Sequence, residues 1–142
     1  MIGFLFAVVA GAAMSVQGVM NTRLQEHVGL WEANAYTQGT ALLLSLIVLW
    51  IFGKGDLSKL ASVPKGYLFS GALGLVITIT VMLSIKGLSP TVAVSTILIA
   101  QLLVAALIDG FGWMGQEKIS MNAKQFIGLG LMLGGVILFK WK

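Results

Sequence analysis

The chain of 142 residues is 58 % hydrophobic and only 10 % charged, with a mean hydropathy of +0.97. Soluble domains carry about 25 % charged and about 45–50 % apolar residues, and a small globule has too little interior to bury such an excess. The composition therefore excludes a water-soluble domain and indicates a membrane protein. The chain lacks cysteine, so disulfides and thiolate metal sites do not apply. Its formal net charge is +4, and its charged residues form no block of like charge that would suggest nucleic-acid binding.

Five apolar runs approach the roughly 20 residues that a helix needs to cross a bilayer core. In chain order they cover residues 2–21, 33–52, 67–86, 91–109 and 123–140. Backbone groups in lipid must be paired within their own segment, so each run is predicted to be a helix. The fold class is therefore all-α: a polytopic membrane protein with five transmembrane helices and one integral membrane domain over residues 1–142.

The first run could be mistaken for a signal peptide, because "AGA" at 10–12 resembles a cleavage site. It lacks a basic n-region, and its apolar character continues past that point. We expect a retained first span.

Polar amides mark the ends of the first two predicted spans, which a loop over residues 22–32 would join into a hairpin. Gln17 and Asn21 are four residues apart and share a helix face, as do Asn34 and Gln38. These amides can tie the hairpin together, since hydrogen bonds between membrane helices contribute about 0.6 kcal/mol on average. They can also line the mouth of a polar cavity and bind a substrate, and the two interpretations are compatible.

The later connections carry turn signals. Residues 53–66 form the longest predicted loop, and "KGLSP" at 86–90 predicts a tight turn. In that turn Ser89 can cap the next helix, and Pro90 suits its first position.

Gln101 is placed near the middle of the fourth predicted span, where water is least accessible. Polar groups at that depth usually face a cavity or a neighbouring helix, so Gln101 is a candidate solute contact or a helix–helix hydrogen bond. Asp109 follows at the end of the same span. A helix C-terminus disfavours a negative charge, so Asp109 is expected to have a compensating cation, for which Lys118 is the near candidate.

The last span contains glycines at small-xxx-small spacing, and such residues let helix backbones approach closely. They are candidates for packing between two subunits or within one subunit: Gly128, Gly130, Gly134 and Gly135.

The loop charges hardly choose an orientation. With five spans, the side of the N-terminus holds Lys54, Lys59, Lys65, Lys118 and Lys124. The other side holds Arg23, Lys86, Lys140 and Lys142. Orientation normally follows an excess of Lys and Arg, so five against four predicts insertion in both directions.

Chemistry-bearing patterns are missing from the sequence. It has no phosphate-binding loop, no metal-ligand cluster and no nucleophile–base constellation, so neither an enzyme nor a cofactor is expected. The single histidine, His27, is predicted to be a solvated loop residue, and no metal site is expected.

Three segments carry a resemblance to a known family: "GAAMSVQGVMNTRL" at 11–24, "AQLLVAALIDGFGWMG" at 100–115 and "FIGLGLMLGGVIL" at 126–138. Together with the five-span layout, they make the chain resemble a YdcZ-like member of the bacterial drug/metabolite transporter superfamily. The resemblance implies a five-helix half-unit of a ten-helix inverted-repeat transporter in the inner membrane. Small multidrug-resistance relatives use a glutamate in the first helix for proton coupling, whereas the comparable helix here carries Gln17.

The predicted function is secondary transport of a small molecule or metabolite by alternating access, with two antiparallel copies forming a dual-topology homodimer. A small dual-topology ion channel and a non-transporting membrane scaffold are the alternatives. In an antiparallel dimer the Arg23 end of one subunit is level with the Asp109 end of the other. An Arg23–Asp109 contact that gates one side of the cavity is therefore a further hypothesis, against the commoner fate of a solvated arginine.

Overall fold

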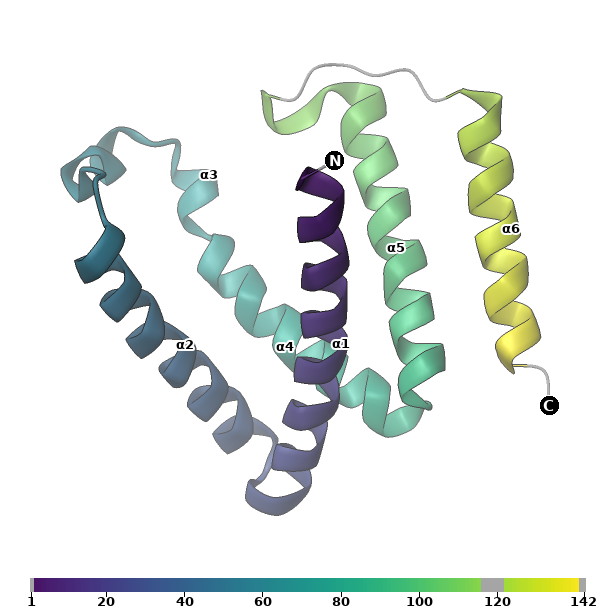
Figure 1. Cartoon of the computed structure of the whole chain (residues 1–142), viewed down its shortest axis with the longest axis horizontal. Coiled ribbons are helices and arrows are strands. Elements are labelled where there is room, and N and C mark those ends of the chain that lie inside the picture. Colours follow the sequence, from purple (N-terminus) through teal and green to yellow (C-terminus); the bar gives the residue numbers. More distant parts are fainter. Residues whose placement is uncertain (1, 116–121, 141–142) are drawn as a thin grey trace. The chain divides into compact units, whose positions relative to one another are not determined.

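The structure is a computed structural model, which describes residues 2–115 and 122–140. Helices account for nearly all of these residues, which confirms the all-α prediction (Figure 1). The contacts within the chain gather in two compact units, residues 1–87 and 88–142. That both belong to one integral membrane domain stays a prediction.

The first unit contains the long helices α1 (Ile2–Val28), α2 (Leu30–Phe52) and α4 (Ser70–Gly87). Between α2 and α4 lie the short helices η1 (Leu57–Ser62) and α3 (Lys65–Leu68). The third predicted span, 67–86, is therefore interrupted at Phe69.

The predicted loop at 22–32 is wrong. Helix α1 continues to Val28 and α2 begins at Leu30, so Gly29 alone separates the two helices (Figure 1). Gly29 has a φ of 101°, which an L-residue with a side chain rarely adopts. The polar residues before it were taken as loop, but no residue among them breaks a helix, and several form bonds within α1.

Side chains in the first unit are buried around this turn and not along the full helices. The buried residues are Gly18, Asn21, Thr22 and Gln25 of α1, Ala33 and Asn34 of α2, and Met82 and Ile85 of α4. Residues 2–14 of α1 and 41–52 of α2 are exposed throughout. Figure 1 shows α1 and α2 diverging from the turn. The three helices are thus held together near one end.

The second unit contains α5 (Pro90–Phe111), the short η2 (Trp113–Gly115) and α6 (Ala123–Lys140). Ser89 caps α5 as predicted, because its Oγ accepts a hydrogen bond from the N–H of Val92 at 3.4 Å. At the other end, Gly112 adopts a left-handed conformation with a φ of 65° and ends the helix.

Four of the described helices are long and apolar enough to cross a membrane: α1, α2, α4 and α5. The apolar stretch of α6, Ala123–Phe139, is shorter. The chain is therefore polytopic, and α6 as a fifth span stays a prediction.

The connection between α2 and α3 is polar and locally ordered. Asp56 caps η1, with its Oδ1 accepting hydrogen bonds from the hydroxyl of Ser58 at 2.6 Å and from its N–H at 2.9 Å. These bonds hold the pKa of Asp56 below its ordinary value.

Candidate functional site

Hydrogen bonds donated by polar side chains connect α1, α2 and α4 near the α1–α2 turn. Thr37 of α2 donates its hydroxyl to Oδ1 of Asn21 at 3.1 Å. The amide of Gln38 donates to the hydroxyl of Thr78 in α4 at 3.4 Å. Gln25 of α1 donates its amide to the carbonyl oxygen of Met82 in α4 at 3.3 Å. Each pair of these three helices therefore shares one such bond, and two of the predicted residues, Asn21 and Gln38, take part.

We call the side chains that form these bonds the polar cluster. Three of its members were not predicted as site residues: Gln25, Thr37 and Thr78. Gln25 was assigned to the loop that proved to be helix. Thr78 donates its hydroxyl to the carbonyl oxygen of Gly74 at 2.9 Å, and it also accepts from Gln38. Thr37 lies three residues after Asn34, and residues at this spacing are neighbours on a helix surface. This spacing could have identified Thr37 as a further polar site residue.

Asn34 is 5 % exposed, and its Oδ1 is buried with no hydrogen-bond partner among the described residues. A buried acceptor without a donor costs about 1–3 kcal/mol. Asn34 therefore lies among the buried polar residues near the α1–α2 turn, but it forms no hydrogen bond that joins the helices.

An open groove runs beside this cluster, between α1 and α2. Its volume is about 690 Å³. Its polar lining comes from both helices: Gln17, Asn21, Arg23 and His27 of α1, and Tyr36, Thr37 and Thr40 of α2. A second hollow of about 600 Å³ along α1 shares Gln17, Met20 and Asn21 with it. The predicted residues of α1 therefore do line open space.

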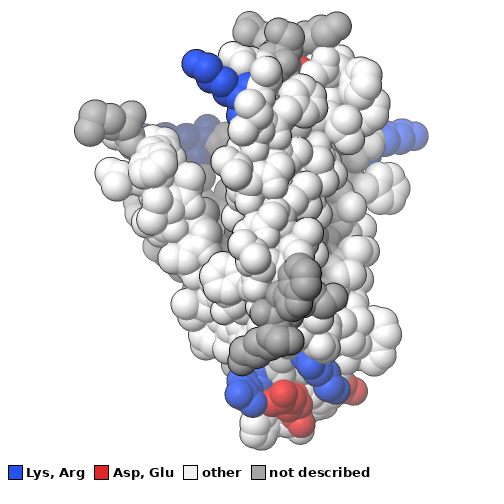
Figure 2. Space-filling model, turned by 90° about the vertical axis from the view of Figure 1, so that its right-hand side faces the viewer, with Lys and Arg blue, Asp and Glu red and all other residues white. Residues whose placement is uncertain are grey.

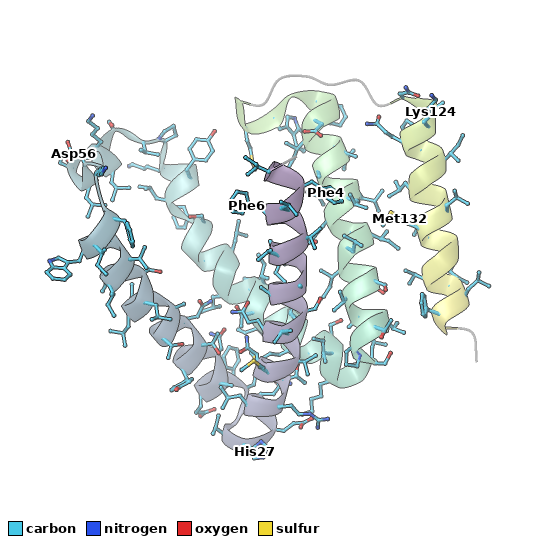
Figure 3. All side chains as sticks on the ribbon, in the orientation of Figure 1. Phe4, Phe6, His27, Asp56, Lys124 and Met132 are labelled. Atoms are coloured by element: carbon cyan, nitrogen blue, oxygen red, sulfur yellow. The ribbon has the colours of Figure 1, made fainter. Side chains whose placement is uncertain are left out.

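Arg23 lies in this groove with an ion-pair partner from its own helix. Its Nη1 is 3.0 Å from Oε2 of Glu26, and the arginine side chain is 75 % exposed. His27 is exposed, as expected, although it belongs to helix α1 instead of a loop, and its Nδ1–H donates to the carbonyl oxygen of Arg23 at 2.8 Å. Figure 3 labels His27 at the α1–α2 turn. The exposed ion pair between Arg23 and Glu26 is weak, because solvent competes for both charges.

The second unit has its own cavity, between α5 and α6, with a volume of about 320 Å³. Its lining from α5 is Leu102, Ala105, Ala106 and Asp109. Its lining from α6 is Gln125, Gly128, Leu129 and Met132. Figure 3 shows Met132 extending from α6 on the side of α5. The structure thus places Asp109 in a largely apolar cavity.

The structure does not bring all predicted residues to one place. Gln101 is exposed on α5, outside the lining of the α5–α6 cavity, and it forms no hydrogen bond with the described residues. Lys118, the expected partner of Asp109, lies outside the described residues. Asp109 itself forms no ion pair within the described part of the chain.

The glycines of α6 meet no neighbour in the described structure. A Cβ built at Gly128, Gly130, Gly134 or Gly135 would have no atom within 4 Å. Gly18 of α1 differs, because a Cβ there would lie 2.9 Å from Cδ1 of Ile85 and 3.1 Å from Cγ1 of Val81. The close helix approach that was predicted for α6 is therefore found between α1 and α4, and the role of the α6 glycines in a dimer stays a prediction.

The charged side chains lie near helix ends and in the loops, while the sides of the helices are uncharged, as Figure 2 shows for the face it presents. Long apolar helices whose charges are confined to their ends define a multi-pass membrane protein. Residues 2–138 match the family model described as "Putative inner membrane exporter, YdcZ", so the chain belongs to this family and is a multi-pass protein of the inner membrane. No curated protein and no solved structure matches the chain.

Proposed function

We propose that this protein exports a small molecule across the inner membrane by alternating access, as an antiparallel homodimer of two five-helix chains. The family match supports a transporter in general. The observation that supports the paired arrangement is the packing of the first unit, in which α1, α2 and α4 bury side chains only around the α1–α2 turn. Residues 2–14 and 41–52 stay exposed, so they are available for packing against another surface.

A second copy suits these surfaces for a geometric reason. Helices that diverge from a turn leave a wedge-shaped space, and a solute path needs walls on all sides. Two copies related by an axis in the membrane plane would supply ten helices, with equivalent inward-facing and outward-facing states. The near-equal Lys and Arg counts on the two sides favour insertion in both orientations.

Gln17, Asn21, Asn34, Gln38 and Gln101 are the proposed substrate contacts. Gln17 and Asn21 have the best support, since both line the α1–α2 groove. Asn21 and Gln38 also tie helices together, so a solute that approached them would compete with existing bonds. Such exchange of partners is one way for binding to shift the equilibrium between two states.

The arrangement can be tested by crosslinking, because the chain has no cysteine of its own. Ile127 and Leu138 are 64 % and 71 % exposed on α6. They are three helical turns apart and therefore share a face. Two differently tagged chains, one with Ile127→Cys and one with Leu138→Cys, are co-expressed and treated with a short thiol crosslinker. An antiparallel α6–α6 contact predicts the mixed product. Products formed only between identical chains would contradict it.

The transport function is tested separately. A thermal-shift screen with purified protein identifies ligands, since a ligand of the native state raises stability by mass action. Efflux of each ligand from proteoliposomes is then measured. Saturable efflux below about 10³ molecules per second is expected for a carrier. Much faster flux would indicate a channel, and ligands that bind without moving would indicate a scaffold.

A further inference from the structure

The cavity between α5 and α6 combines apolar walls with a single charged side chain among the described residues. Leu102, Ala106 and Asp109 recur along one face of α5, and Gly128 and Met132 lie on the facing side of α6. Its volume of about 320 Å³ is at the lower end of the range for small-molecule sites, about 300–1,000 Å³. A pocket with this lining suits a ligand that is mostly apolar and carries one polar group.

The charge in the cavity is negative and unpaired among the described residues. Asp109 is partly buried in the last turn of α5, and that turn contains no basic residue. The C-terminal end of the α5 dipole adds to the negative potential there. A positive group is therefore the complementary occupant.

Two features of α6 act in the opposite sense. The N-terminus of α6 brings the positive end of its dipole to the region of Gln125, and Lys124 is next to it (Figure 3). Lys124 is exposed and forms no ion pair with Asp109. Oε1 of Gln125 already accepts the N–H of Asn122 at 2.8 Å. Neither residue therefore neutralises the carboxylate directly.

The described walls offer few ligands for a metal ion. Ca²⁺ and Mg²⁺ need about six oxygen ligands, and besides the Asp109 carboxylate the side-chain oxygen available in the lining is that of Gln125. An organic cation needs no such shell, because its apolar body gains from leaving water and its charge needs only one anion.

We propose that this cavity binds an organic cation, an amine or a quaternary ammonium with a small apolar body, whose charge lies at Asp109 and whose body extends toward Met132. The inference rests on the proposed transport function, because it names the class of substrate.

The test is direct binding to purified full-length protein in detergent, by calorimetry and thermal shift, with benzyltrimethylammonium as the probe. Its neutral carbon isostere, neopentylbenzene, has the same shape without the charge. Saturable binding of the cation, at least tenfold tighter than that of the isostere, is expected. Equal binding of both compounds, or no binding of the cation, would overturn the proposal.

Variants assign the site. Asp109→Asn removes the charge at constant size, and Gly128→Leu fills the cavity without a clash at its Cβ. Each is expected to weaken cation binding at least tenfold. Asp56→Asn, which removes a carboxylate far along the chain in the exposed η1 cap, is the matched control and is expected to bind normally. If Asp109→Asn does not fold, Gly128→Leu alone decides the question, and normal binding by it would overturn the proposal.

Measurements of binding and of transport together distinguish a failure of the proposed cation site from a failure of the proposed export function. A cation that binds at Asp109 but is not moved through proteoliposomes supports the site and contradicts the exporter. Efflux of compounds that are not cations, with no binding of benzyltrimethylammonium, supports the exporter and contradicts the site.

Discussion

Replacing Gly18 by leucine tests whether α1 and α4 are in contact as the structure places them. A Cβ at this position would be 2.9 Å from Cδ1 of Ile85 and 3.1 Å from Cγ1 of Val81. Ile85 Cδ1 is the end of a flexible side chain and can move. Val81 is β-branched and stiff, so it yields less. Gly18→Ala should therefore cost less stability than Gly18→Leu, because its Cβ requires only small shifts of the two neighbouring side chains, whereas the longer leucine side chain must separate the helices.

The expected magnitude follows from two opposing effects. Overpacking a close contact costs about 1–3 kcal/mol. Replacing glycine by leucine inside a helix gains up to about 1 kcal/mol. Gly11 allows the second effect to be removed, because it lies two turns earlier on the same face of α1 and a Cβ there has no atom within 4 Å. Gly18→Leu should therefore be about 1–3 kcal/mol less stable than Gly11→Leu.

The assay is unfolding in mixed micelles by titration with dodecyl sulfate, followed by tryptophan fluorescence. The titration is repeated over a range of protein concentrations. A loss at Gly11→Leu that depends on concentration reports an effect on assembly, while the Gly18→Leu loss should be independent of it. Equal stability of the two variants at every concentration would refute the α1–α4 contact and the packing argument built on it.

Three further predictions concern the polar residues. Asn21→Leu and Thr37→Val should show a coupling of about 0.6 kcal/mol, up to about 1.7, in a double-mutant cycle of unfolding free energies, and a coupling of zero would mean that their bond contributes nothing. Gln101→Leu should unfold like the wild type, because the side chain is exposed and unbonded within the described chain, yet it should abolish efflux; normal efflux would exclude Gln101 as a solute contact. Arg23→Asp and Asp109→Arg should each lower the stability of the dimer and the double exchange should restore it, whereas effects that simply add would exclude the pair.

The sequence was sufficient to predict the helices, because lipid leaves a long apolar segment no other way to pair its backbone. The capping of α5 by Ser89 also followed from local chemistry. The α1–α2 connection did not, because the residues from 22 to 28 are mostly polar, and polarity alone does not separate a loop from an exposed helical turn. Gly29 was the true signal of the turn.

Side-chain partners were harder to predict than helices. The amide of Gln38 was found by its spacing, but its acceptor, Thr78, is 40 residues away and on a different helix. No local pattern specifies which helices will be neighbours. The same limit applied to the glycines: spacing pointed to α6, and the close approach is at Gly18, where a single glycine meets two branched side chains.

The division between a bonded end and an open end has a consequence for motion. Around the turn, α1, α2 and α4 are joined by hydrogen bonds between each pair of helices, so in the absence of solute that end should move as one body. Away from the turn the helices share few buried side chains. Shifts of their free ends therefore break few contacts and cost little free energy, as hinge motions between alternate states require. If two such chains assemble, the rigid ends would carry the groove residues and the free ends would carry the rearrangement. Crosslinks within one chain between residues 2–14 and 41–52 should therefore block transport more strongly than crosslinks close to Gly29.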